Sequence, residues 1–421
     1  MKRFLISAML LVLPAAAFCA DQPVPQKPLT LTECYKLALR QSEIIAVDSE
    51  RIREAEGRFL QALGTVLPHV SFSHLQQREQ LATNSTPRNS YEQKFVFTQN
   101  LFQGFKEFAG IAGGHYEKKQ RQQELLRAKQ LLFTDVSDAF YLLMETREDR
   151  RTLETIERAF IDRVQELKSR EQLGKSRRSE VVSTETQLYS TEDQIQQLKS
   201  QEEIARELLE FLIGRPVGEI TDSDVVIALR PEPAYTARAA SRADVLAQQL
   251  AWKTAKEGAT VARSNFLPTV TAEGDYFTHR QPSARGSGDW QAFISVNIPL
   301  FEGTTNFGQV KEANAIAKEN ELLYKRAGRV AEQDIHNAYV NTSASFLRTR
   351  ILEKALKSAE LNYDLQSRDY KLNVVNNLDV LTALQDLENA RRNYTRVSYE
   401  SRRFYWQLQT AAGEINPDTI R

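Results

Sequence analysis

Two neighbouring stretches of this 421-residue chain, at about 269–279 and 289–299, alternate apolar and polar residues with a period of two. Alternation of this kind predicts strands that are apolar on one face and polar on the other. A weaker pair of strands is expected at about 69–80 and 91–101. The clearest apolar face consists of Trp290, Ala292, Ile294, Val296 and Ile298, and Phe293 is the exception among the polar residues between them.

Long stretches without helix-breaking residues separate these strands. No proline occurs between Pro87 and Pro216 or between Pro299 and Pro417. Such stretches, rich in Glu, Gln, Arg and Leu, predict long helices. We expect them from Gly104 to about Gln172, at about 179–213, at about 304–370 and at about 378–412. The longest would span about 100 Å at 1.5 Å per residue.

Shorter helices are expected before each pair of strands. Thr30 and Glu33 match a capping box, so a helix should begin near Leu31 and run to about Leu67; another should cover about 241–266. On the helix expected at about 304–370, mostly small residues recur at spacings of four and three, which indicates a close helix–helix seam. The seam residues are Ala331, Ile335, Ala338, Thr342, Ser345, Thr349 and Leu352.

The turns between helix and strand occur twice. Leu67-Pro68-His69-Val70 corresponds to Leu267-Pro268-Thr269-Val270, 200 positions later (268 − 68), and Leu101-Phe102-Gln103-Gly104 corresponds to Leu300-Phe301-Glu302-Gly303, 199 later (303 − 104). A fixed long offset predicts a tandem duplication. We expect a first repeat at 21–214, a linker at 215–240 and a second repeat at 241–421.

The first 20 residues have the features of a secretory signal peptide. Lys2 and Arg3 precede an apolar run from Phe4 to Phe18. Phe18 stands before Cys19 where a lipoprotein signal needs a small residue, so we do not expect lipidation. If Cys19 leaves with the signal, Cys34 is the one cysteine that remains, and no intrachain disulfide can form.

Charge and motifs exclude several classes of function. The net charge is zero, with 55 basic and 55 acidic residues, and no basic block suggests nucleic-acid binding. The five histidines have no metal-ligand spacing, and the chain has no phosphate-binding loop and no nucleophile elbow. We therefore expect no catalytic residues, no metal site, no cofactor and no enzymatic activity.

Four strands cannot close a membrane barrel within one chain. An open sheet edge is not tolerated in lipid, because each unpaired backbone group there costs several kcal/mol. Two chains would give a plugged barrel of eight strands, and three would give twelve strands with a lumen. The polar face would then line the lumen, and the apolar face, with Tyr276 and Trp290, would contact lipid. A soluble sandwich is the alternative for these strands.

The duplication, the Leu-Pro-x-Val strand starts and the Leu-Phe-x-Gly strand ends resemble the TolC-like outer-membrane efflux proteins. The resemblance covers nearly all of the mature chain. It implies a mainly α fold with a β-barrel part, in which three chains share a 12-stranded outer-membrane barrel continued by a long α-helical barrel in the periplasm. It also implies a channel of the Gram-negative outer membrane that works with a periplasmic adaptor and an inner-membrane transporter.

The resemblance implies a gate at the inner end of the helices. By residue-for-residue match, Glu180 would bond Tyr370 and hold the gate closed, and three copies of Asp379 would form an acidic ring in the pore. Thr382 stands where the best-known members have a second aspartate, and Val375 where they have an arginine. Glu180 and Asp379 have a second interpretation as acidic residues that stabilise helix N-termini.

The two turns between the long helices are the expected docking points for the adaptor. They comprise Leu173, Gly174, Lys175 and Ser176 in the first repeat, and Leu372, Asn373 and Val374 in the second. Asn373 replaces the usual glycine, and asparagine tolerates a left-handed backbone. A soluble periplasmic coiled-coil scaffold or adaptor is the second hypothesis for the function. The sequence does not indicate whether a duct would carry small molecules or proteins.

Overall fold

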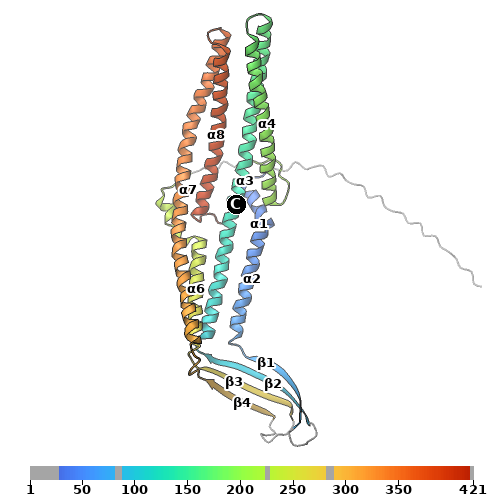
Figure 1. Ribbon diagram of the computed structural model, residues 1–421, viewed down its shortest axis with the longest axis vertical. Helices are drawn as coiled ribbons and strands as arrows, with labels where there is room; N and C mark the ends of the chain where they lie inside the picture. The colour runs from blue at the N-terminus through green and yellow to red at the C-terminus, as the bar shows by residue number, and fades with distance from the viewer. Residues whose placement is uncertain (1–27, 81–87, 223–227, 281–288, 418–421) are drawn as a thin grey trace, which may run out of the picture.

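The computed structural model describes residues 28–80, 88–222, 228–280 and 289–417 of the chain. The expected signal peptide, residues 1–20, lies outside this part. The described chain is a long helical column with one β-sheet at its end (Figure 1). The fold class expected from the sequence, long helices with four strands, is confirmed. The elements of the first repeat are α1 (Leu31–Gln41), α2 (Glu43–Gly64), β1 (His69–Glu79), β2 (Arg88–Gln103), α3 (Lys106–Gln172) and α4 (Arg178–Ile213).

The second repeat has the same order of elements. After a four-residue helix and a 3₁₀ turn, its helices and strands correspond to those of the first repeat. Both α3 and α7 have 67 residues, and α7 begins 199 positions after α3 (305 − 106). The two short elements, α5 (Pro233–Thr236) and η1 (Ala239–Ser241), lie at the end of the expected linker. They are followed by α6 (Ala243–Ser264), β3 (Thr269–Arg280), β4 (Trp290–Asn297), α7 (Thr305–Lys371) and α8 (Asn377–Ala411).

The first helix is shorter than the sequence indicated. Thr30 and Glu33 form the expected capping box, but the helix ends at Gln41 instead of continuing to about Leu67. Ser42 has an extended backbone, with φ −64° and ψ 114°, and its hydroxyl accepts a hydrogen bond from the amide of Ile45. Serine favours helix N-caps because its side chain can satisfy a free amide there. One residue thus ends α1 and begins α2.

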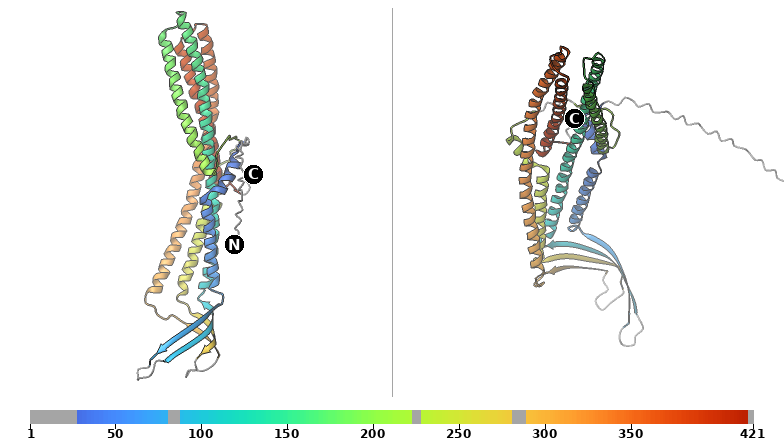
Figure 2. Two further views of the ribbon diagram at one scale, coloured as in Figure 1. Left: turned by 90° about the vertical axis from the view of Figure 1, so that its right-hand side faces the viewer. Right: turned by 45° about the horizontal axis from the view of Figure 1, so that its top comes forward.

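The four strands form a single antiparallel sheet in the order β1-β2-β3-β4. The central pair, β2 and β3, joins the two repeats, and the strands curve away from the column (Figure 2). The register places Phe72 opposite Phe95, Phe95 opposite Tyr276, and Tyr276 opposite Trp290. Opposite residues share a face, so one apolar face extends across all four strands.

The helices form a curtain that is one layer thick. Near the sheet the neighbours are α2–α3–α6–α7, and towards the far end they are α4–α3–α8–α7. Tyr35 and Tyr235, 200 positions apart, are both fully buried where α1 and α5 lie beside the middle of the column. Four of the seven seam residues expected on α7 are buried, namely Ala331, Ile335, Thr342 and Ser345, and the other three are partly exposed. Thr342 Oγ1 donates to the carbonyl of Phe404, on α8, at 3.0 Å.

Candidate functional site

The two turns at the end of the column opposite the sheet contain most of the residues singled out from the sequence (Figure 1). The first turn joins α3 to α4 and includes Leu173, Gly174, Lys175 and Ser176, and the second joins α7 to α8 and includes Leu372, Asn373 and Val374. Leu173, Leu372 and Val374 are 70–72% exposed. Both turns therefore present apolar side chains to the outside at the tip of the column.

Gly174 and Asn373 give the two turns the same backbone. Their φ angles are +69° and +61°, in the left-handed region. In each turn this residue donates its amide three residues back, and the next residue donates five residues back, which is a Schellman motif. The expected left-handed conformation of Asn373 is therefore confirmed. Its side chain also accepts a hydrogen bond from Arg170 Nη1 at 3.2 Å.

Glu180 lies in the first turn of α4 and is half-buried. Its carboxylate accepts a hydrogen bond from the hydroxyl of Ser176. The next residue, Val181, is buried in a small apolar cluster with Leu167, Tyr370 and Val380. Glu180 is thus next in sequence to a residue that packs in the same cluster as Tyr370. Among the hydrogen bonds of the described residues, however, none joins Glu180 to Tyr370, although the resemblance led us to expect one.

Tyr370 is next to the last residue of α7 and is only 6% exposed. Two guanidinium groups of α3 cover its ring: the Cζ of Arg163 lies 3.6 Å from the ring centroid and that of Arg170 lies 4.5 Å away. The arginines are two helical turns apart, about 10.5 Å of rise, which leaves room for a ring between them. Neither arginine was identified from the sequence. The signal that could have identified Arg163 is its position: a charged residue between Phe160 and Leu167, which are buried on the same face of the helix.

A buried polar chain connects the same arginine to two further helices. Arg163 Nε donates to Asn377 Oδ1 at 2.9 Å, and Asn377 Nδ2 donates to Thr184 Oγ1 at 3.3 Å. Arg163 belongs to α3, Thr184 to α4 and Asn377 to α8. Since Tyr370 belongs to α7, these contacts link all four helices at the tip.

Asp379 and Thr382 lie on the first turns of α8. Asp379 forms a capping box with Asn376: its carboxylate accepts the Asn376 amide at 3.0 Å, and its own amide donates to the Asn376 side chain at 3.1 Å. This is the helix-stabilising role that the sequence allowed for an acidic residue at this position. Thr382 is exposed, and its hydroxyl donates to the carbonyl of Leu378.

The polar face of the sheet has an ion pair at its centre. Lys94 Nζ lies 2.8 Å from Asp275 Oδ2, and Gln291 Nε2 donates to the same oxygen at 2.7 Å. The Asp275 side chain is only 1% exposed. The ion pair joins β2 to β3, and therefore connects the two repeats, and Gln291 extends the contact to β4.

The described ranges contain no group of three or more His, Cys, Asp or Glu residues that could hold a metal ion. In the same ranges, no helix is both long enough and apolar enough to cross a membrane.

Comparison with known proteins places this geometry in context. The family described as "Outer membrane efflux protein" matches residues 34–215 and 235–414. The chain is 22% identical to the pyoverdine export outer membrane protein OpmQ of Pseudomonas putida, over 87% of this chain and 82% of that protein. It is also 22% identical to the alkaline protease secretion protein AprF of Pseudomonas aeruginosa, over 98% of this chain and 88% of that protein.

A solved structure has the same fold. The outer membrane protein VceC of Vibrio cholerae superposes with a TM-score of 0.81 at 20% identity, over 91% of this chain and 96% of that one.

Proposed function

This chain belongs to the outer membrane efflux protein family, and from that membership we propose that three copies form the exit duct of a tripartite efflux or type I secretion system. Members of this family are channels, so the chain is a transport protein of the Gram-negative outer membrane and not an enzyme. The observation that carries the proposal is a sheet with one continuous apolar face, attached to a helical curtain about 100 Å long.

The sheet has two free edges, β1 and β4, within one chain. In an antiparallel sheet of four strands the two edge strands run in opposite directions. The β4 of one copy can therefore pair in antiparallel fashion with the β1 of the next, and three copies close a ring of twelve strands. Closure satisfies the edge backbone groups, as a membrane requires. The apolar face would then contact lipid and the Lys94–Asp275 face would line the lumen.

The helical curtain also has two open edges. One is α7, and the other is formed by α2 and α4. Exposed apolar side chains occur on both edges, as expected of surfaces that pack against another copy. On α7 they include Ile316, Leu322, Leu323, Val330, Leu347, Ile351, Leu361 and Leu365; on α2 and α4 they include Ile44, Val47, Leu60, Val182, Tyr189, Ile204, Leu208 and Phe211.

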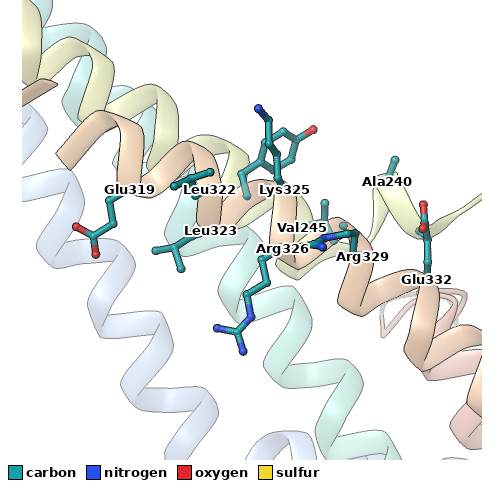
Figure 3. Close-up of a pocket in the computed structure, with 12 residues that line it drawn as sticks. Ala240, Val245, Glu319, Leu322, Leu323, Lys325, Arg326, Arg329 and Glu332 are labelled. Carbon is teal, nitrogen blue, oxygen red and sulfur yellow. The ribbon is translucent and has the colours of Figure 1, made fainter. Parts of the chain in front are cut away.

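Figure 3 shows part of the α7 edge. An open groove of about 790 Å³ is lined by α7, α6 and η1, with Leu322 and Leu323 beside Lys325 and Arg326. In the proposed trimer this edge faces the α2–α4 edge of the neighbouring copy, and the groove belongs to the contact between copies.

The inner end is proposed as the gate and the docking site. Glu180, Tyr370, Asp379 and Thr382 form the gate region of each copy. The exposed turns beside them, Leu173 to Ser176 and Leu372 to Val374, are proposed to bind a periplasmic adaptor, which connects the duct to an inner-membrane transporter. The exposed leucines and valine of these turns support an apolar docking contact.

Two cargo classes are open to such a duct. The name of OpmQ refers to export of pyoverdine, and that of AprF refers to secretion of a protease. Both relatives are 22% identical to this chain, so identity favours neither cargo.

Extraction of cell envelopes tests the proposal against the soluble scaffold. Envelopes are washed with high salt and with carbonate, and then treated with detergent. A duct remains in the pellet until detergent is added. Release of the chain by salt or carbonate alone would support the scaffold and contradict the duct.

A further inference from the structure

The ring of Tyr370 connects the two helical hairpins of each copy. Tyr370 belongs to the hairpin of α7 and α8, whereas Arg163 and Arg170, which cover its ring, belong to the hairpin of α3 and α4. The ring is buried, and a desolvated cation–aromatic contact is stronger than an exposed one. Separation of the hairpins at the tip would break both ring contacts.

Both arginines are held in place on α3. Glu166, which lies between them on the same helix face, accepts from Arg163 Nη1 at 2.9 Å and lies 3.4 Å from Arg170 Nε. This carboxylate offsets the repulsion between the two cations. Each arginine also reaches the second hairpin by a hydrogen bond, Arg163 to Asn377 and Arg170 to Asn373.

One nitrogen of the Arg163 guanidinium makes no hydrogen bond among the described residues, and the aromatic ring of Tyr370 is the favourable contact that this group has instead. This nitrogen is Nη2, and it is buried. A stacked aromatic face is a favourable environment for a guanidinium plane. The hydroxyl of Tyr370, by contrast, makes no hydrogen bond to Glu180 in the described part of the chain. The Glu180 carboxylate instead accepts a hydrogen bond from the hydroxyl of Ser176.

We infer that Arg163 and Arg170 are positioning residues that hold the tip closed by clamping the aromatic ring of Tyr370, and that the tyrosine hydroxyl is dispensable for closure. This clamp rests on the proposed duct, because it specifies how the inner end of that duct is kept shut. It requires an aromatic ring at position 370 and a planar cation at position 163.

Four variants of the full-length chain separate the ring from the hydroxyl. Tyr370→Phe keeps the ring, Tyr370→Leu removes it, Arg163→Gln removes the cation, and Arg163→Lys restores the charge without the planar stack. Arg158→Gln is the matched control, since Arg158 is an exposed arginine five residues away on the same helix. Each protein is first checked for a heat-sensitive oligomer, and its single-channel conductance is then measured in planar bilayers.

The clamp predicts that Tyr370→Phe and Arg158→Gln conduct like the wild type. Arg163→Gln should raise the open fraction at least roughly tenfold, the effect expected from loss of one desolvated ring contact. Tyr370→Leu loses both ring contacts and should raise it further, and Arg163→Lys should fall between the wild type and Arg163→Gln. Opening of Tyr370→Phe to the level of Tyr370→Leu would overturn the inference, because the hydroxyl would then hold the tip. Unchanged conductance in Arg163→Gln would overturn it as well.

Hydrogen exchange of the backbone amides in both turns gives a second readout that needs no conduction. The clamp predicts faster exchange in both turns for Arg163→Gln and Tyr370→Leu, but not for Tyr370→Phe. If the wild type forms no pore, the duct is contradicted while this exchange pattern still decides the clamp. If the wild type conducts and the exchange of all variants is the same, the clamp is overturned and the duct stands.

Discussion

Gly174 and Asn373 hold the same left-handed conformation at the same position of the two repeats, 199 residues apart (373 − 174). Each closes the Schellman motif that ends a 67-residue helix. The two turns thus share one backbone although one residue lacks a side chain and the other has an amide. The side-chain oxygen of Asn373 accepts a hydrogen bond from Arg170, which adds a contact between the two hairpins.

Substitution of Gly174 by alanine should destabilise the first turn. No heavy atom would lie within 4 Å of the new Cβ, so the effect comes from the left-handed φ of +69° alone. We expect a loss of about 1–2 kcal/mol, read as a lower Tm of the detergent-solubilised protein. Gly57→Ala is the control: Gly57 lies in α2 with equally open surroundings, so alanine should stabilise that helix by up to about 1 kcal/mol. Equal Tm changes in the two variants would contradict this explanation.

Two neighbouring residues of β4 should respond oppositely to arginine. Ile294 lies on the apolar face and Ser295 on the polar face, and both are exposed in the single chain. Ile294→Arg would place a charge in lipid, at a cost of about 2–4 kcal/mol near the membrane midplane, whereas Ser295→Arg would face the lumen. We expect much less membrane-embedded oligomer for Ile294→Arg and near-normal amounts for Ser295→Arg. The reverse result would mean that the two faces are assigned wrongly.

Asp138 on α3 should make stability depend on pH. Burial raises the pKa of its carboxyl, against the opposing effects of Gln407, which donates to both of its oxygens at 3.1 Å, and of Arg403. A raised pKa in the folded state means that the folded protein binds the proton more readily than the unfolded chain. Asp138 therefore destabilises the fold above its raised pKa, and this effect disappears as the pH falls towards the ordinary carboxyl range.

The measurement is the Tm of the wild type and of Asp138→Asn between pH 8 and pH 4. The amide stays neutral throughout, so the stability of the variant relative to the wild type should be greatest at high pH and should decline as the pH falls. A Tm difference that is constant over this range would show that the burial of Asp138 does not govern its titration.

Charge in the second turn should abolish docking and leave the duct intact. The double variant Leu372→Asp, Val374→Asp replaces two exposed apolar side chains of the tip. We expect the oligomer and its conductance to persist, while co-purification of a periplasmic adaptor after crosslinking in cells is lost. Lys354→Asp, an exposed change about 27 Å back along α7, should retain the adaptor. Retention of the adaptor by the double variant would place docking elsewhere.

The long helices and the strands could be predicted because each follows from local rules. Absence of proline marks α3 and α7, and alternation marks β4. The break between α1 and α2 was missed because Ser42 is compatible with a helix, and only its hydrogen bond to the Ile45 amide reveals it as a cap. The two pairs of matched turns between helix and strand, by contrast, were visible in the sequence as corresponding positions.

The clamp on Tyr370 could not be derived from the sequence. Arg163 and Tyr370 are 207 residues apart (370 − 163), and no local pattern relates them. Their contact depends on how α3 packs beside the second hairpin, which is a property of the folded chain. The side chain of Val375 packs against the apolar cluster of Leu167, Val181, Tyr370 and Val380, which is likewise a contact between segments far apart in the chain.

The mass of the detergent-solubilised protein tests the central claim most directly. Envelopes are extracted in mild detergent and separated on a calibrated semi-native gel, with unheated and boiled samples side by side. A shared barrel of twelve strands predicts a band near three times the monomer mass that collapses to the monomer on boiling. A monomer in the unheated sample would leave β1 and β4 unpaired, and it would contradict the trimeric duct.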